Sequence, residues 1–186
     1  EIVVALEALG GPSLRLLGQR ERDWDESNAS ALLQPLMDAA TIVYAPSRID
    51  FHPDHLLAAR VVAALVRPGQ IVRIMELGVP LTSRLVNLVA DVSSVLSAKE
   101  RALAAFATQR ATILILGRLA RYRAHRFGHT NVEVFWEMGG ASYRRLMAGN
   151  TNGAVFRGIR ARPFLDPLCW LLGRSERGRL LRVATQ

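Results

Sequence analysis

Residues 41–55 read TIVYAPSRIDFHPDH, and this stretch decides how the chain around it folds. Its first part is a β-rich run that ends at Pro46, and a polar loop follows. Pro53 then stands where a helical pattern over residues 56–66 would begin, a position at which proline is well tolerated. The stretch therefore predicts a strand, a loop and the N-terminus of a helix.

The loop brings two imidazoles and two carboxylates together within a short span, Asp50, His52, Asp54 and His55. Three residues apart on the first helical turn, the histidines should project to one side, separated by roughly 4.5 Å of rise. The helix dipole should keep His55 neutral, as a metal ligand must be, while Asp54 should accept an N–H from a neighbouring imidazole and favour its charged form. The sequence predicts a functional site here, with histidines that merely cap the helix as the alternative.

Composition places the chain among ordinary globular proteins. Its 186 residues are half apolar and 22% charged, which suits a domain with a sizeable core. The net charge of +8 comes almost entirely from arginine, since Lys99 is the only lysine. An anionic substrate or membrane surface would suit this charge, and so would a biased genome. Cys169 is alone, which excludes an internal disulfide and a cysteine-based zinc site and fits a reducing, cytoplasmic compartment.

Strands and helices are expected to alternate along the chain. We expect strands over residues 13–17, 41–46, 70–77, 85–92 and 132–138, helices over 29–39, 56–66, 98–124 and 142–148, and a turn at 139–140. Such alternation is typical of an α/β domain with a mainly parallel sheet and flanking helices. Ligands of these sheets bind beyond the carboxyl ends of the strands, where the histidine loop would lie.

The two ends of the chain need separate interpretations. Glu1 already lies inside an amphipathic helical pattern, so we expect upstream sequence to be missing. We divide the rest into a domain over residues 1–149 and a basic tail over residues 150–186. The tail could pack on the domain as a final helix or contact an anionic membrane surface.

The loop motif Asp50-x-His52-Pro53-Asp54-His55, followed by a helix, resembles the second signature of the LmbE-like, or PIG-L-like, N-acetylglucosaminyl deacetylases. Weaker similarities follow the family's order, at Glu1-x-x-x-Ala5-Leu6-x-x-Leu9-Gly10, Leu16-Leu17-Gly18, Asp91-Val92-Ser93, Lys99-x-x-Ala102-Leu103, Phe106-x-Thr108-Gln109 and Glu133-x-Phe135. The resemblance covers roughly residues 1–148. It implies a Rossmann-like fold that here lacks its first strand.

The resemblance also implies a function, hydrolysis of the N-acetyl group of an N-acetylglucosamine-containing small molecule or glycolipid by an enzyme that uses zinc or another divalent metal. It assigns His55 as the metal ligand, His52 as the group that stabilises the oxyanion or protonates the leaving amine, and Asp54 as the partner that orients His52. The family's other metal ligands and its general base lie in an A-H-P-D-D-E segment that this chain does not contain, so we expect these 186 residues alone to bind zinc weakly and to be inactive.

Two other functions stay open. The chain could be a catalytically inactive, deacetylase-like scaffold, or a basic module that binds anionic lipid or nucleic acid through its arginines. Nucleic acid is the less expected partner, because aromatic residues are few and no nucleic-acid motif occurs. His125 and His129 could form a second metal pair on a helix, although Gly128 favours a helix end between them.

Overall fold

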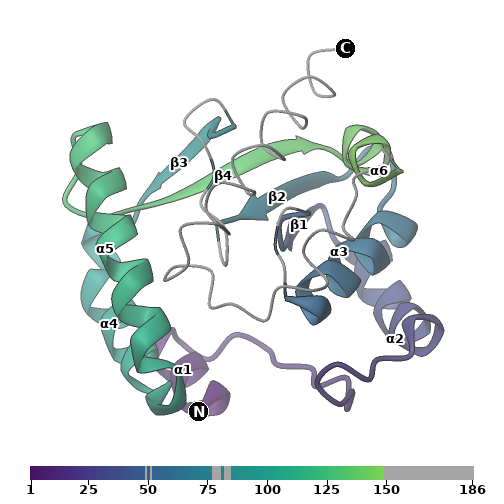
Figure 1. Ribbon diagram of the computed structural model, residues 1–186, viewed down its shortest axis with the longest axis horizontal. Helices are drawn as coiled ribbons and strands as arrows, with labels where there is room; N and C mark the ends of the chain where they lie inside the picture. Colours follow the sequence, from purple (N-terminus) through teal and green to yellow (C-terminus); the bar gives the residue numbers. More distant parts are fainter. Residues whose placement is uncertain (49, 51, 77–80, 82–84, 149–186) are drawn as a thin grey trace. The chain divides into compact units, whose positions relative to one another are not determined.

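The computed structural model describes residues 1–48, 50, 52–76, 81 and 85–148 (Figure 1). The tail predicted over residues 150–186 lies outside these residues. The described helices are α1 (Ile2–Ala8), α2 (Glu26–Ala39), α3 (Pro53–Leu65), α4 (Leu96–Ala104), α5 (Arg110–Phe127) and α6 (Gly140–Ala148), with short 3-10 turns at Ser93–Val95 and Ala107–Gln109. The strands are β1 (Ile42–Ala45), β2 (Ile71–Met75), β3 (Leu88–Asp91) and β4 (Val132–Gly139).

The expected α/β class is confirmed, but the expected mainly parallel sheet is wrong. The four strands form one mixed sheet in the order β1-β2-β4-β3, in which β1 is parallel to β2 and β4 is antiparallel to β2. A single crossover helix between neighbouring strands would have made them parallel. β2 and β4 are instead linked through β3 and two helical segments, 93–104 and 107–127, which are bent by 95° relative to each other.

Three local predictions also differ from the structure. The expected strand over 13–17 is absent, and Leu14 and Leu16 there are 43% and 74% exposed. The single helix expected over 98–124 is interrupted between α4 and α5. No turn separates the elements at 139–140, because β4 ends at Gly139 and α6 begins at Gly140.

The chain separates into two compact units. The first contains Glu1–Leu16 and Val89–Val134, and with them α1, α4 and α5. The second contains, among the described residues, the stretches 17–88 and 135–148, and with them α2, α3 and α6. No single helix in the described residues is long and apolar enough to cross a membrane, although the bent pair 93–104 and 107–127 reaches that length and composition when the two are joined.

The second unit holds the main core and the histidine loop. Its core residues come from α2, β1, α3, β2, β4 and α6 and include Val43, Ala45, Val62, Val66, Val72, Ile74, Trp136, Tyr143 and Leu146. The buried amide of Gln70 donates to the carbonyls of Met37 and Ala40 and so ties the end of α2 to the start of β2. This packing supports β1 and α3, the two elements that flank the predicted site.

Candidate functional site at the start of α3

His52 begins α3 as its N-cap, which confirms the predicted strand, loop and helix. Its backbone is extended, with φ −71° and ψ 124°, and its ring nitrogen Nδ1 accepts the backbone N–H of Asp54 at 3.3 Å. Pro53 occupies the first helical position, where no amide hydrogen is needed. The cap therefore fixes the His52 ring at the point where the loop enters the helix.

A buried carboxylate organises both histidines. Asp50 is only 1% exposed, and its Oδ1 accepts the backbone N–H of His52 at 2.9 Å. Its Oδ2 lies 2.9 Å from Nδ1 of His55. The two imidazole rings lie side by side, with centroids 4.8 Å apart. The predicted projection of both histidines to one side is confirmed, and Asp50 is the residue that holds them there.

The charge preference of His55 differs from the expectation of a neutral ring. The hydrogen bond to Asp50 raises the pKa of His55, partial burial opposes this, and the negative charges of Asp50 and Asp54 add to the increase. The helix dipole was the only influence that the sequence suggested, and a directly bonded carboxylate outweighs it. When the Nδ1–H of His55 donates to Asp50, Nε2 is the nitrogen left for a ligand.

Asp54 contacts His52 in a different way from the one predicted. Its Oδ1 accepts the backbone N–H of Arg22 at 2.9 Å, and its Oδ2 lies 4.0 Å from Nδ1 of His52, too far for a hydrogen bond. That Nδ1 instead accepts the backbone N–H of Asp54. The expected hydrogen bond between the His52 ring and the Asp54 carboxylate is therefore not the arrangement in this structure.

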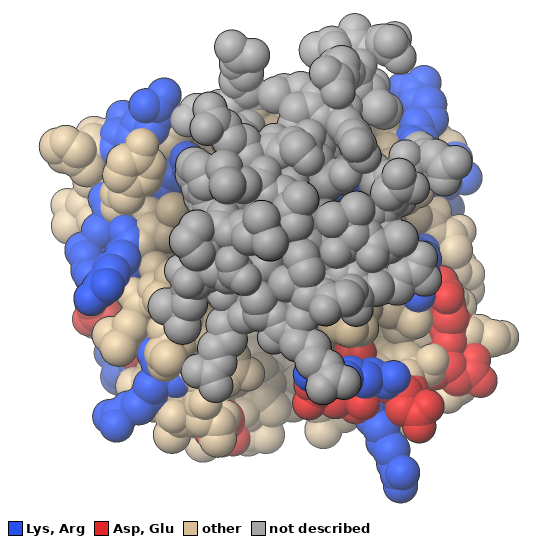
Figure 2. All heavy atoms as spheres, in the orientation of Figure 1, with Lys and Arg blue, Asp and Glu red and all other residues tan. Residues whose placement is uncertain are grey.

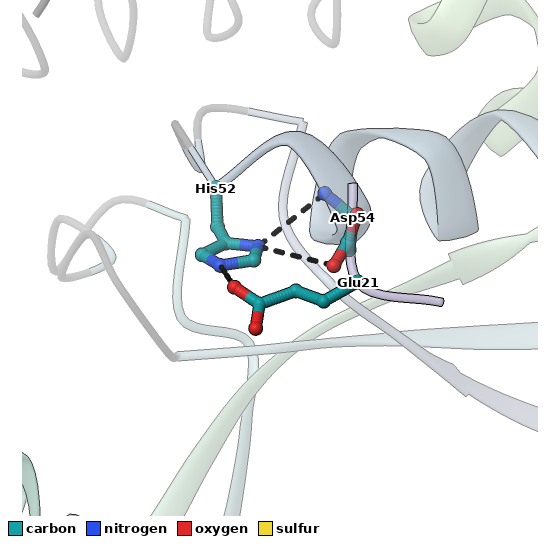
Figure 3. Close-up of side chains that lie close together, drawn as sticks. All are labelled: Glu21, His52 and Asp54. Atoms are coloured by element: carbon teal, nitrogen blue, oxygen red, sulfur yellow. Dashed lines mark hydrogen bonds and ion pairs between the residues drawn. The ribbon is translucent and has the colours of Figure 1, made fainter. Parts of the chain in front are cut away.

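Glu21 is the member of the site that the sequence did not predict. Its Oε1 lies 3.7 Å from Nε2 of His52, whereas Asp54 faces the other ring nitrogen, Nδ1 (Figure 3). Glu21 belongs to a tight turn closed by a bridge between Arg20 and Asp23, in which Arg22 adopts a left-handed φ of 66°. The bond from Arg22 to Asp54 anchors this turn at the start of α3. The only signal in the sequence was the high charge density of the turn.

Three side chains at this place could together hold a metal ion. Glu21, His52 and Asp54 each offer a ligand atom, and these three atoms all lie within 4.8 Å of one another. Imidazole nitrogen and carboxylate oxygen are ordinary ligands of zinc. His55 lies beside this group with Asp50 behind its ring, and a carboxylate behind an imidazole is typical of histidines that bind metal.

The second histidine pair does not form a site. α5 ends at Phe127, and Gly128 follows in a left-handed conformation with φ 73°, which confirms the predicted helix end. His125 is on the helix, whereas His129 is beyond it, with its Nδ1 3.2 Å from Oδ2 of Asp91. Among the described residues, neither histidine belongs to a group of three potential ligands.

Comparisons with known proteins support the fold of this chain and do not indicate an activity. No family model matches the chain, and no curated protein is similar to it. One solved structure is similar, the crystal structure of the conserved protein TT1542 from Thermus thermophilus. The two are 19% identical with a TM-score of 0.52, over 70% of this chain and 68% of that chain. At this identity the likeness shows a shared α/β fold alone.

Proposed function

We propose that this chain is a metal-dependent N-acetyl-sugar deacetylase of the LmbE-like or PIG-L-like kind, with the Rossmann-like fold of that family. The observation that carries the proposal is the pairing of buried Asp50 with His55, directly beside the capping residue His52. A carboxylate this deeply buried needs a compensating partner, and here that partner is an imidazole whose other nitrogen is left for a ligand.

The position of the loop supports the same proposal. It follows β1, a strand paired in parallel with β2, and it leads into α3. Loops after the carboxyl ends of parallel strands are the usual ligand-binding places of α/β proteins. The resemblance of the His-Pro-Asp-His element to the family's second signature then gives this general position a specific chemistry.

Zinc or another divalent metal would be held by Nε2 of His55, and the carboxylates of Glu21 and Asp54, which flank the neighbouring ring of His52, would be further donors. When bound, such an ion lowers the pKa of a water molecule and polarises the amide carbonyl. The protein's own contribution is to orient the ligands. Asp50 fixes the tautomer of His55, and the bond from Arg22 to Asp54 fixes the carboxylate of Asp54.

His52 would act on the reacting amide itself. Its Nε2–H is a hydrogen-bond donor that can stabilise a developing oxyanion, an interaction worth on the order of 3 kcal/mol in the barrier. The leaving nitrogen must also receive a proton. If the His52 ring takes a second proton, that proton enters at Nδ1 and faces Oδ2 of Asp54 at 4.0 Å, while Glu21 faces the other nitrogen. Two carboxylates thus flank the ring, one near each nitrogen.

The proposed substrate is an N-acetylglucosaminide, either a small molecule or a glycolipid, and the proposed compartment is the cytoplasm. The native protein, freed of metal and then reconstituted with zinc, should release acetate and a free amine from such a substrate. His55→Ala should lose zinc and activity together, because the variant removes the ligand that Asp50 orients. Elemental analysis and release of acetate would be measured on the same samples.

A control variant tests whether the effect of His55→Ala is specific to this site or would follow the removal of any histidine. His125 is exposed on α5 in the other unit, so His125→Ala should keep both zinc and activity. Full activity in His55→Ala would overturn the assignment. Zinc that binds normally to a protein with no deacetylase activity would instead favour the inactive scaffold.

A further inference from the structure

We propose that the exposed face of α5 is a docking surface for an anionic lipid bilayer. This surface, called the α5 stripe below, consists of Leu114, Arg118, Arg121, Tyr122, His125 and Arg126. It lies in the first unit, whereas the histidine loop lies in the second. The inference is therefore independent of the proposed deacetylase activity.

The charged side chains of α5 other than histidine are all positive. The helix contains five arginines and no aspartate or glutamate among its 18 residues. Several cations elsewhere in the described chain are paired, as in Lys99 with Glu133 and Arg73 with Glu137. Within the described residues, Arg118, Arg121 and Arg126 form no such ion pair. The stripe therefore presents uncompensated positive charge.

The spacing of these residues places them on one side of the helix. Leu114, Arg118, Tyr122 and Arg126 follow one another at intervals of four, and Arg121 and His125 lie between them on the neighbouring row. Figure 2 shows blue side chains, the colour of lysine and arginine, along its left edge, with uncharged tan surface between them. By the spacing in the sequence, arginine alternates with leucine or tyrosine along a single row of α5.

The large apolar side chains within the α5 stripe indicate that its partner is lipid. Leu114 is 67% exposed and Tyr122 is 59% exposed, although both are on a helix that could have turned them inward. α1 in the same unit also exposes apolar residues, with Val3 at 53% and Val4 at 57%. A solvated basic face or a nucleic-acid surface would not need exposed leucine and valine, whereas a helix lying in a membrane interface buries such residues among lipid chains.

The weak packing of α5 supports the same conclusion. Only Arg123 and Ala124 are fully buried in this 18-residue helix, and its isoleucines and leucines other than the exposed Leu114 are half-buried. Most helices of globular proteins owe their stability to packing of an apolar face. A helix rich in isoleucine and leucine that buries so little of itself gains further burial when it lies on a bilayer whose headgroups match its charge.

Vesicle flotation of the native protein tests the proposal. The probes are vesicles of phosphatidylcholine alone and of equal parts phosphatidylcholine and phosphatidylglycerol, and we expect binding to the second kind that weakens as salt is added. Arg118→Gln together with Arg121→Gln should reduce the partition coefficient on the order of tenfold to thirtyfold. Leu114→Gln should reduce it as well, by removing apolar burial without changing charge.

Matched controls remove the same groups from the other unit. Arg144→Gln with Arg145→Gln takes two exposed charges from α6, and Leu36→Gln takes a 44% exposed leucine from α2. Both controls should float as the native protein does, and circular dichroism would check that all variants are folded. Equal losses in the α5 and α6 variants would overturn the proposal, because binding would then follow net charge alone. Binding to duplex DNA that depends on the α5 stripe, with no binding to vesicles, would also overturn it.

Discussion

The carboxylate of Asp50 and the imidazole of His55 lie 2.9 Å apart, and the same carboxylate accepts the backbone N–H of His52. One side chain, 1% exposed, therefore sets the ring of one histidine and the backbone of the other. The pairing also raises the pKa of His55. Metal and proton would compete for this ring, and Asp50 stabilises both of these bound forms.

Asp50→Asn should weaken zinc binding by about tenfold to a hundredfold while the loop keeps its shape. The amide oxygen can still accept the backbone N–H of His52, but its NH2 group would face Nδ1 of His55. That contact forces the His55 proton onto Nε2, the nitrogen that a metal needs. Competition with a chromophoric chelator measures the affinity. Asp38→Asn, at an exposed carboxylate of α2, is the control and should bind zinc normally.

The sequence was informative where one short stretch contained the whole signal. Pro46, Pro53 and the apolar runs beside them were enough to predict β1, the loop and α3, and the three-residue spacing of His52 and His55 was enough to predict their proximity. Strand direction was not predictable in this way, because β4 pairs with β2, from which it is separated by β3 and two helices.

The place of Glu21 in the site was not predictable from the sequence either, because it depends on a contact between segments far apart in the chain. Its place beside His52 depends on a turn in which Arg22, a residue with a Cβ, adopts a left-handed backbone that glycine or asparagine would ordinarily supply. No turn residue in the sequence marks that conformation. The contact that fixes the turn, from the backbone of Arg22 to Asp54, joins segments far apart in the chain.

Gly140→Ala should destabilise the fold by about 1–3 kcal/mol or more, because the added carbon would overpack a tight contact. A Cβ at this position would lie 2.1 Å from the carbonyl oxygen of Arg67 and 2.9 Å from Cγ2 of Val66. Gly117→Ala is the matched control, since its Cβ would meet nothing nearer than Arg121 at 4.0 Å. In the interior of α5 that change should stabilise by roughly 0.5–1 kcal/mol. Opposite signs in urea unfolding are the expected result, and equal effects would contradict this account.

Ser93→Ala should raise the pKa of Asp91 toward its ordinary value. Hydrogen bonds from the hydroxyl and backbone of Ser93 lower that pKa, with a smaller contribution from His129. Because the pKa is depressed in the folded state, this contribution to stability is present above the unfolded value of 3.8 and is lost as the pH falls through the folded value. Carboxyl carbon NMR would follow the titration. An unchanged Asp91 pKa in the variant would show that the hydroxyl is not the cause.

The two roles of His52, as helix cap and as a group acting on the substrate, can be separated by choice of substitution. His52→Ala removes both, so it should cost about 1 kcal/mol of stability. His52→Asn restores a good capping side chain but has no imidazole, so it should unfold like the native protein. Both variants should retain zinc, since His55 remains with Asp50 behind it.

Deacetylation should fall in both variants, with kcat lower by on the order of a hundredfold because an interaction made mainly in the transition state is lost. Urea unfolding, zinc content and acetate release would be compared for the native protein and the two variants. Native stability with a large loss of kcat in His52→Asn would assign the ring to the chemistry. If His52→Asn instead recovers both stability and activity, the ring serves only to start α3, and the reacting groups must be sought elsewhere.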